Sequence, residues 1–373
     1  MKSLHLPSRL WRDVVAIDPG EPVSLRMLAI AALGMGVPVV AGLMLGQAEA
    51  GFTIGLGAIL LAGAPTGGSG SAATPPPPLS QSVAPALIAV AVATVVSALP
   101  QPDLALISLA AVAALLSGYS RPIAGGAIRF IIYFVLSVGF LDGAPAHRGA
   151  AALIFGLGAL WNIALRGILA GGRRSQKGLA HKTRQTPTHA QRRAYFRRTL
   201  YRLEGWQFPL RLALGLGIAS VLRHLWPTHH FYWILLTVAL LTQRPIEHVP
   251  VKTVQRLAGT LGGVALTGAI LCYVSSPVAL GIVACLLATV VPLARARNYL
   301  LYAVVSTPLI LLVLDIGKPI ASALLTDRLI ATLAGGLTVM TLNVLFDRLL
   351  AASAGDVSDR QLGHQVTVQS KDR

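Results

Sequence analysis

Residues 27–45 read MLAIAALGMGVPVVAGLML, a run of nineteen residues without a charged side chain. An α-helix needs about 20 mostly apolar residues to cross the hydrocarbon core of a bilayer. The run is too long for the apolar region of a secretory signal peptide and starts too far from the N-terminus, although Ala48-Glu49-Ala50 resembles a cleavage site. It therefore predicts a first membrane span, preceded by a cytoplasmic segment at 1–24.

The composition of the whole chain has the same character. Of its 373 residues, 54% are hydrophobic and only 12% are charged, whereas a soluble domain typically has about 25% charged residues. The mean hydropathy is +0.67. These values argue against a soluble enzyme and a disordered chain. The two cysteines, Cys272 and Cys285, lie in apolar runs, so neither a disulfide framework nor a thiolate metal site is expected.

Apolar stretches recur along the chain, six before and six after a polar segment. They lie at roughly 27–45, 51–64, 83–99, 103–118, 123–141, 149–170, 209–226, 232–243, 254–274, 277–293, 298–314 and 326–346. We therefore predict an all-α polytopic membrane protein with about 12 transmembrane helices. The stretches at 51–64 and 232–243 fall short of a full span, which indicates broken, tilted or re-entrant helices and leaves ten or eleven spans open.

Positive charges are distributed unevenly between the two sides that this arrangement defines. With both termini cytoplasmic, 26 of the 31 Lys and Arg residues fall in cytoplasmic segments, four fall on the opposite side, and Arg129 lies inside a span. Basic residues favour cytoplasmic loops, so the asymmetry supports this orientation. It also accounts for the net charge of +17 without nucleic acid as a partner.

Ordered markers recur in the two sets of stretches. Leu25-Arg26-Met27 opens the first set and Leu210-Arg211-Leu212 opens the second, and Asn162 in the sixth stretch parallels Asn343 in the twelfth. Six spans return the chain to the same side, so the sets would be parallel repeats about an axis along the membrane normal. The predicted divisions are a first six-helix half at 25–170, a basic cytoplasmic linker with an amphipathic helix at 171–208, a second half at 209–350 and a flexible cytoplasmic tail at 351–373.

Motifs of soluble enzymes are absent from the sequence. It has no GxxxxGK[ST] phosphate loop, no HExxH, no GxSxG and no paired-cysteine metal spacing. His229-His230 is better explained as part of a wet loop than as metal ligands, and glycine pairs such as Gly259/Gly263 favour close helix packing. We predict no catalytic residue, no metal and no cofactor, and so a protein that is not an enzyme.

Residues 189–206, HAQRRAYFRRTLYRLEGW, combine five arginines with aromatic side chains. Phe196, Leu200 and Leu203 have the spacing of one helix face, and the arginines lie mainly on other faces. The pattern predicts a basic amphipathic helix on the anionic inner surface of the membrane. An arm that binds RNA or docks a partner protein is the alternative.

Charged side chains near membrane spans are costly to bury and therefore informative. Asp142 and Asp315 end corresponding helices at the outer side, where Arg148 and Arg328 precede the next helices. These groups would form structural ion pairs or take part in transport. Three arginines open helices at the inner side, either as topology anchors or as an electropositive vestibule that concentrates organic anions, namely Arg26, Arg211 and Arg256.

The sharpest motif lies at 231–263. Phe231-Tyr232-Trp233 opens a short apolar helix that ends at Gln243-Arg244-Pro245, and the segment from Arg256 to Gly263 reads RLAGTLGG. This order resembles the fusaric-acid-resistance and aromatic-acid-exporter family. The resemblance covers residues 25–350 and implies a bacterial inner-membrane protein of two six-helix halves that exports aromatic or other organic carboxylates, driven by the proton gradient.

The resemblance also bears on partners. Some members of the family work with a periplasmic adaptor protein, and self-association into a homo-oligomer is left open. Larger members carry sizeable cytosolic domains between and after the halves. This chain has instead a linker of about 40 residues and a tail of about 25, which leaves regulation and partner choice open.

The resemblance and the charge pattern together suggest a mechanism. An organic anion would enter from the cytoplasm, meet the aromatic side chains at the start of the short helix, and exchange for a proton at Asp142 or Asp315. The expected substrate-binding residues are Arg26, Arg211, Tyr232, Trp233, Gln243, Arg256 and Thr260. A passive organic-anion channel and a non-transporting membrane scaffold are the alternatives.

Overall fold

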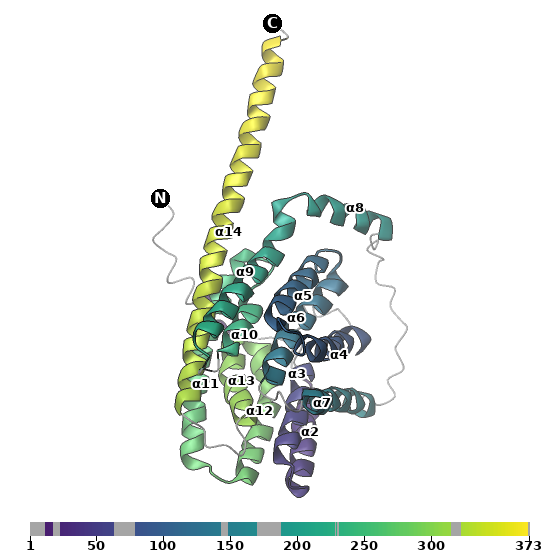
Figure 1. The fold of residues 1–373 in the computed structure, drawn as a ribbon, viewed down its shortest axis with the longest axis vertical. Coiled ribbons are helices and arrows are strands. Elements are labelled where there is room, and N and C mark those ends of the chain that lie inside the picture. The colour runs from purple at the N-terminus through teal and green to yellow at the C-terminus, as the bar shows by residue number, and fades with distance from the viewer. Residues whose placement is uncertain are drawn as a thin grey trace.

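The structure, a computed structural model, describes residues 12–17, 23–62, 79–142, 148–169, 188–227, 229, 231–314 and 322–371. The regular secondary structure in these ranges is entirely helical, which confirms the all-α prediction. The helices (Figure 1) are α2 (Leu25–Met44), α3 (Ala48–Ala62), α4 (Leu79–Val96), α5 (Pro102–Leu116), α6 (Arg121–Asp142), α7 (Arg148–Leu169), α8 (His189–Leu200), α9 (Leu203–Leu225), α10 (Tyr232–Leu241), η2 (Ile246–His248), α11 (Val249–Tyr273), α12 (Pro277–Arg297), α13 (Tyr299–Leu314) and α14 (Ser322–Lys371).

Seven of the described helices are long and apolar enough to cross a bilayer, namely α2, α6, α7, α9, α11, α12 and α14. Five more are apolar but shorter, namely α3, α4, α5, α10 and α13. Each predicted apolar stretch is therefore helical. Length and composition together show a multi-pass membrane protein, because so many apolar helices have no place in a water-soluble fold.

Helices of the second set pack in the same pairs as their counterparts in the first. Within the first set, α2 packs on α3, α3 on α7, α4 on α6, α5 on α6 and α4 on α7. Within the second set, α9 packs on α10, α10 on α14, α11 on α13, α12 on α13 and α11 on α14. Between the sets, the contact of α2 with α12 is matched by that of α9 with α5, and the contact of α3 with α13 by that of α10 with α6.

The short helix α10 forms the centre of the core. Eight of its ten residues are buried, from Trp233 to Leu241. A helix that is apolar on all sides is stable only where neighbours cover every face. Helices α6, α9 and α14 supply that cover, so α10 is enclosed by helices of both sets.

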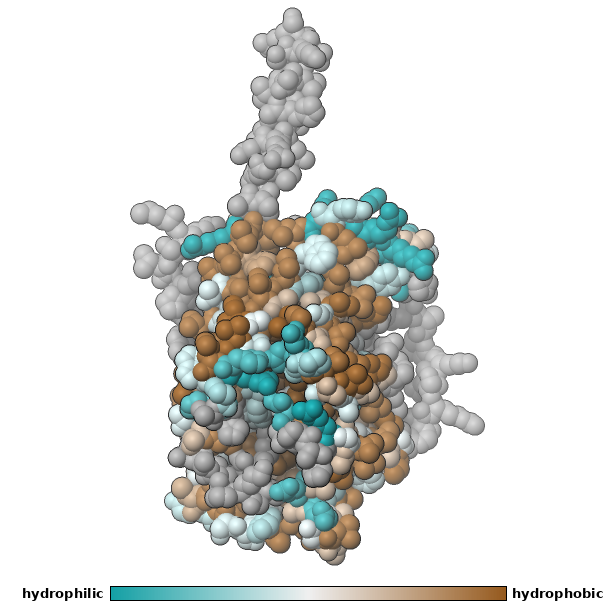
Figure 2. Space-filling view, viewed as in Figure 1, coloured by the Kyte–Doolittle hydropathy of each residue, from teal (hydrophilic) through white to brown (hydrophobic). Residues whose placement is uncertain are grey.

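Large apolar side chains are exposed in stripes on the outer helices. Figure 2 shows a surface that is mostly hydrophobic on this face, with hydrophilic residues gathered near α8 and in one central patch. A soluble protein rarely exposes so large an apolar surface, so these stripes are the lipid-facing side. On α2, α7 and α12 they include Leu33, Val37, Val40, Leu153, Leu157, Leu160, Val278, Ile282 and Leu286.

Glycines of α11 allow α13 to approach closely. A Cβ atom added at Gly263 would lie 2.6 Å from Thr307 Cβ, and one at Gly259 would overlap Ala303. Small residues spaced four apart let two helix backbones come together in an apolar medium. The Gly259/Gly263 pair therefore packs α11 against α13.

The N-terminal segment is bound to the second set of helices. Val14 is fully buried, and its carbonyl oxygen accepts hydrogen bonds from Gln255 Nε2 (3.0 Å) and Asn298 Nδ2 (3.0 Å). Asn298 Nδ2 also donates to the carbonyl of Ala16 (2.8 Å). Residues 12–17 thus dock at the first turns of α11 and α13.

Two boundaries differ from those expected from the sequence. Helix α9 begins at Leu203, before the expected start at 209, and the backbone of α14 continues as one helix through Lys371. Charged and polar residues after 351 predicted a flexible tail, but the segment contains no Pro and only two Gly, so the helix has no strong local stop signal. Residues 65–78, which include the four prolines from Pro75 to Pro78, lie outside the described residues.

We predict that Gly263→Ala lowers the unfolding temperature of the purified protein. The added methyl group would push Thr307 and the carbonyl of Val304 away, and such overpacking costs about 1–3 kcal/mol. Gly268→Ala is the matched control, because it lies on the same helix and its added Cβ meets no atom within 4 Å. Equal unfolding temperatures for the two variants would contradict this packing.

Candidate functional site

Arg328 of α14 lies deep in the second set of helices with its guanidinium against an indole ring. Its side chain is 1% exposed, and its Cζ atom lies 3.9 Å from the centroid of the Trp233 ring. Among the described residues, neither Nη atom of Arg328 has a hydrogen-bond acceptor, and Trp233 Nε1 has none either. Because a buried donor without an acceptor costs about 1–3 kcal/mol, more when charged, this arrangement calls for an anion.

Thr260 of α11 lies at the same level as Arg328. Asn343 of α14 bonds the carbonyl of Ile246 and Gly336 approaches Thr253, so the two helices run antiparallel. These two contacts are seven residues apart on both segments. A further seven residues, backward along α14 and forward along α11, bring Arg328 level with Thr260 and the residue after it. Thr260 is the twelfth of the 25 residues of α11, about halfway along that helix.

The hydroxyl of Thr260 differs from the other threonine hydroxyls of α11. Thr253 and Thr267 each donate to the carbonyl four residues earlier, over 2.8 Å. Thr260 is fully buried, and its Oγ1 atom has no hydrogen-bond partner among the described residues. The Thr260 hydroxyl therefore does not donate to the carbonyl four residues earlier, and it is available to a ligand.

Arg256 and Tyr299 complete the group. Arg256 is 2% exposed and is a charged neighbour of Arg328, as is the phenol of Tyr299. Arg256 Nε and the Tyr299 hydroxyl also lack hydrogen-bond partners within the described chain. We refer to five residues together as the cationic cluster, namely Trp233, Arg256, Thr260, Tyr299 and Arg328.

Further cations connect the cationic cluster to the first set of helices. Lys252 neighbours Arg256 and Arg295, and Arg295 in turn neighbours Arg129. Arg129 neighbours Arg166, which neighbours Arg26. Tyrosines lie between the charges, since Lys252 Nζ is 5.0 Å from the Tyr299 ring centroid and Arg295 is 5.4 Å from that of Tyr302. We call Arg26, Arg166, Arg129, Arg295 and Lys252 the cation series.

Arg211, which the sequence suggested as a substrate ligand, is bound by the protein itself. Its side chain is 2% exposed. Nη1 donates to Asn343 Oδ1 (2.8 Å), and Nη2 donates to the carbonyls of Gln243 and Arg244. Gln243 thus takes part through its backbone oxygen. Arg211 ties α9 to α14 and to the end of α10, which fixes the helix that presents Trp233.

Tyr232 borders the cationic cluster, since it interacts electrostatically with Arg328 as Tyr299 does, and Arg26 lies outside it. The Tyr232 ring packs on α6, where a Cβ at Gly139 would lie 2.6 Å from Tyr232 Cδ2. Its ring centroid is 4.4 Å from that of Trp233, yet it faces the first set of helices. Arg26 is exposed, and its Nη2 atom donates to the carbonyl of Arg166 over 2.9 Å. Of the seven expected ligands, Trp233, Arg256 and Thr260 come together.

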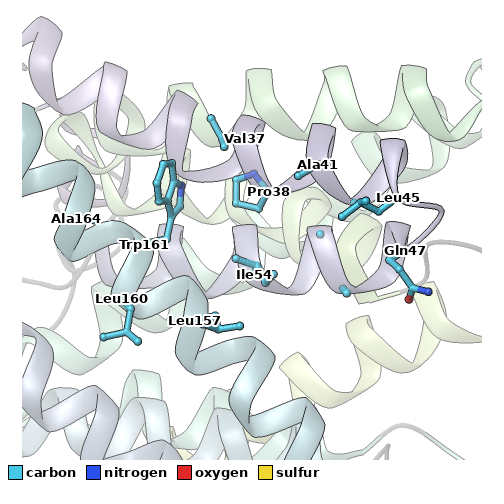
Figure 3. A pocket seen from close by; sticks show the side chains of 13 residues that line it. Val37, Pro38, Ala41, Leu45, Gln47, Ile54, Leu157, Leu160, Trp161 and Ala164 are labelled. Carbon is cyan, nitrogen blue, oxygen red and sulfur yellow. The ribbon is translucent and has the colours of Figure 1, made fainter.

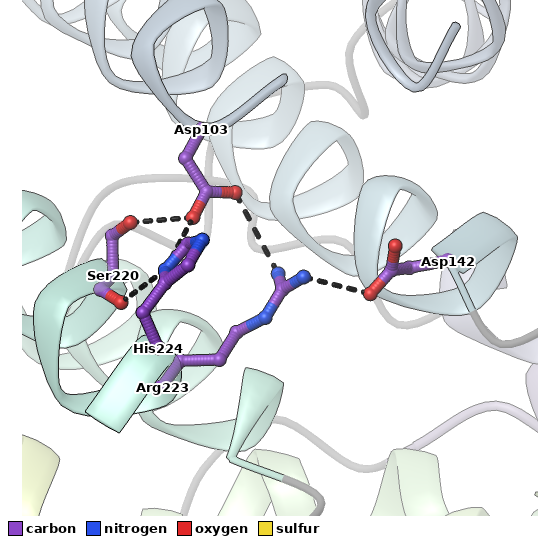
Figure 4. Close-up of polar contacts among 5 residues, drawn as sticks. All are labelled: Asp103, Asp142, Ser220, Arg223 and His224. Atoms are coloured by element: carbon purple, nitrogen blue, oxygen red, sulfur yellow. Dashed lines mark hydrogen bonds and ion pairs between the residues drawn. The ribbon is translucent and has the colours of Figure 1, made fainter. Parts of the chain in front are cut away.

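Asp142 belongs to an ion-pair group that joins the two sets of helices (Figure 4). Its Oδ2 atom lies 2.7 Å from Arg223 Nη2, and Arg223 Nη1 lies 3.6 Å from Asp103 Oδ1. Asp103 also accepts from the Ser220 hydroxyl and lies 3.6 Å from His224 Nδ1. The prediction that Asp142 pairs with Arg148 is therefore wrong. Asp315, the other expected proton carrier, falls outside the described residues.

A buried carboxylate, Asp327, lies beside Arg328 in the chain. It is 3% exposed, and its Oδ1 atom pairs with His229 Nδ1 over 2.7 Å. His229 also stacks on Phe231 with ring centroids 4.9 Å apart. This loop histidine, expected to be simply wet, therefore anchors the start of α10 to α14.

A large groove lies away from these charges, between α2, α3 and α7 (Figure 3). It has a volume of about 510 Å³ and is lined almost entirely by apolar side chains, with Gln47 at one end. Trp161 crosses it and donates from Nε1 to the carbonyl of Leu33 over 3.1 Å. Because Val37 and Leu157 on its walls are also exposed, the groove opens to the lipid side.

We predict that Asn343→Ala destabilises the fold. The substitution leaves Arg211 Nη1 buried without its acceptor, which costs about 1–3 kcal/mol or more for a charged donor. Thermal unfolding in detergent measures the effect, with the exposed Thr341→Ala on the same helix as the control. An unchanged unfolding temperature would show that Arg211 does not depend on Asn343.

Comparison with known proteins gives one match. Residues 214–342 match the family model described as fusaric acid resistance protein-like. All five residues of the cationic cluster lie inside the matched segment. No curated protein and no solved structure matches the chain. The match confirms the resemblance seen in the sequence for the segment 214–342.

Proposed function

We propose that this protein transports organic carboxylates across the bacterial inner membrane, and that the cationic cluster binds the carboxylate group. The family match supports a transport-related membrane protein. The observation that carries the proposal is the guanidinium of Arg328, which is buried with two unpartnered Nη atoms. A carboxylate is the group that fits such a donor pair most directly, through two parallel N–H···O bonds.

The surroundings of Arg328 define how a carboxylate would bind. Trp233 covers one face of the guanidinium, so the anion would approach along its edge. The Trp233 N–H and the hydroxyls of Thr260 and Tyr299 would complete the donors around it. An aromatic ring on the substrate would find the indole and phenol rings beside the carboxylate, which suits aromatic acids.

The cation series would bring the anion to this position. Its members extend from Arg26 on α2 to Lys252 on α11, and the electrostatic interactions of the buried members include other cations of the series. A row of like charges in a low-dielectric surrounding attracts anions strongly. Export would then begin from the cytoplasm, the side to which the excess of Lys and Arg in the sequence assigns both termini.

The helix packing supports two parallel six-helix repeats. Most pairs that pack in the first set recur in the second, and the contacts of α2 with α12 and of α3 with α13 recur with the sets exchanged. This is the pattern that a two-fold axis between α2–α7 and α9–α14 would produce. The shorter helices, α3 and α10 among them, would then be spans that leave backbone groups within the membrane, as broken helices do at transporter sites.

Proton exchange would occur where Asp142 meets Arg223. This carboxylate lies at the contact between the two sets of helices, so a change in its charge would alter how the sets hold together. Helices α9 and α10 would couple the Asp142–Arg223 contact to the cationic cluster. Such coupling is present in an exporter and absent from a passive channel of the same architecture.

We expect Arg328→Gln to lower transport by about 10-fold or more, since hydrogen bonds to a charged group contribute about 1.5–3 kcal/mol. Uptake of radiolabelled aromatic carboxylates into inverted vesicles, with and without an uncoupler, measures it. Arg348→Gln, an exposed arginine on the same helix, is the control. Undiminished uptake by Arg328→Gln at equal protein level would refute the site, and uptake insensitive to the uncoupler would indicate a channel.

We expect Asp142→Asn to abolish uncoupler-sensitive accumulation while passive equilibration of the carboxylate persists. The same vesicles measure both quantities, and Asp347→Asn, an exposed carboxylate on α14, is the control. Arg223→Gln tests the ion pair without removing the carboxylate. Intact accumulation in Asp142→Asn would mean that Asp142 does not carry the proton.

A further inference from the structure

We propose that the corner between α8 and α9 binds the headgroup of an anionic phospholipid. The surface consists of Arg198, Tyr201, Arg202 and Trp206, and we call it the headgroup surface. The headgroup surface shares no residue with the cationic cluster, so this proposal does not depend on carboxylate transport.

Helix α8 is a well-defined element rather than a loose linker. Thr188 caps it, since the Thr188 Oγ1 atom accepts from the Gln191 N–H (3.3 Å) and the Thr188 N–H donates to Gln191 Oε1 (2.9 Å). Its apolar side packs on the first set of helices, where Phe196 meets Tyr119 edge to face with ring centroids 5.8 Å apart. Phe196 therefore faces protein and not lipid, in contrast to the prediction from the sequence.

The corner after α8 is fixed by two contacts. Trp206 Nε1 donates to the carbonyl of Leu200 over 2.8 Å, which folds the indole back over the end of α8. Gly205 lies so close to Thr199 that any Cβ would overlap its backbone. Arg198, Tyr201 and Arg202 are thereby held at one edge of the molecule, as Figure 1 shows for the turn from α8 into α9.

The lipid-facing stripe of α9 begins at this corner. Its large exposed apolar side chains are spaced three or four residues apart, namely Leu203, Trp206, Leu210, Leu214, Ile218, Val221 and Leu225. Acyl chains cover such a stripe, and headgroups lie just beyond its end. Tyr201, which is 86% exposed, and the exposed Arg202 lie one step beyond Leu203, at the depth of the phosphate.

The arginines of the headgroup surface form no ion pair with an acidic side chain of the described chain. Residues 189–206 contain five arginines and one glutamate, and no ion pair of the described chain involves Arg198 or Arg202. Arginine binds phosphate oxygens bidentately, and tyrosine and tryptophan prefer the membrane interface. The adjoining acyl-chain stripe favours a lipid phosphate over a nucleic acid, which would need a wider polar surface.

Retention of phosphatidylglycerol and phosphatidylcholine by the purified full-length chain, measured by native mass spectrometry, tests the proposal. We expect preferential retention of phosphatidylglycerol, lowered about 10-fold or more by Arg198→Gln/Arg202→Gln, because each basic residue near the surface contributes about 1 kcal/mol. Arg192→Gln/Arg193→Gln is the matched control, since it removes the same charge from the other end of α8.

Two further measurements keep the test decisive. Unchanged thermal unfolding of both double variants shows that the fold is intact, and competition on the unmodified protein needs no variant. Equal retention of the two lipids, equal loss in the control pair, or displacement of phosphatidylglycerol by a short RNA at equal concentration would each overturn the proposal.

Discussion

Polar groups inside an apolar molecule must find their partners within the protein, and the rest of this structure depends on that constraint. It explains why every described stretch that could enter a bilayer is helical. It also explains why threonine hydroxyls in α10, α11 and α13 turn back to carbonyls of their own helices. Against this background of satisfied groups, the few donors that lack acceptors become informative.

Two buried arginines show how the constraint separates structure from function. Arg211 and Arg328 are almost equally buried, at 2% and 1% exposure. Arg211 has acceptors on α14 and at the end of α10, and it holds the short helix in place. Arg328 has an aromatic ring on its face and no acceptor at its Nη atoms. Arg211 therefore has a structural role, whereas the Nη atoms of Arg328 have donors to offer to a ligand.

The fold class and the positions of the helices were predictable because both depend on local composition. The partners of charged residues were not, because spacing along a chain does not tell which helices meet. Asp142 pairs with Arg223, 81 residues away, and Asp103 and His224 carried no motif that pointed to them. The motif around Trp233, Arg256 and Thr260 contains three residues of the cationic cluster. Arg328 was expected to form an ion pair or to take part in transport, but it was not among the expected ligands, since its isolation from acceptors is a property of three-dimensional packing.

The docking of residues 12–17 has a consequence for how the chain is made. Val14 and Asn298 are 284 residues apart, so residues 12–17 meet their binding site only after α11 and the start of α13 have been synthesised. During nearly all of translation, the carbonyls of Val14 and Ala16 must remain with water. Closure of this contact is therefore a late event in biogenesis, and it joins the start of the chain to its second half only once that half has been inserted.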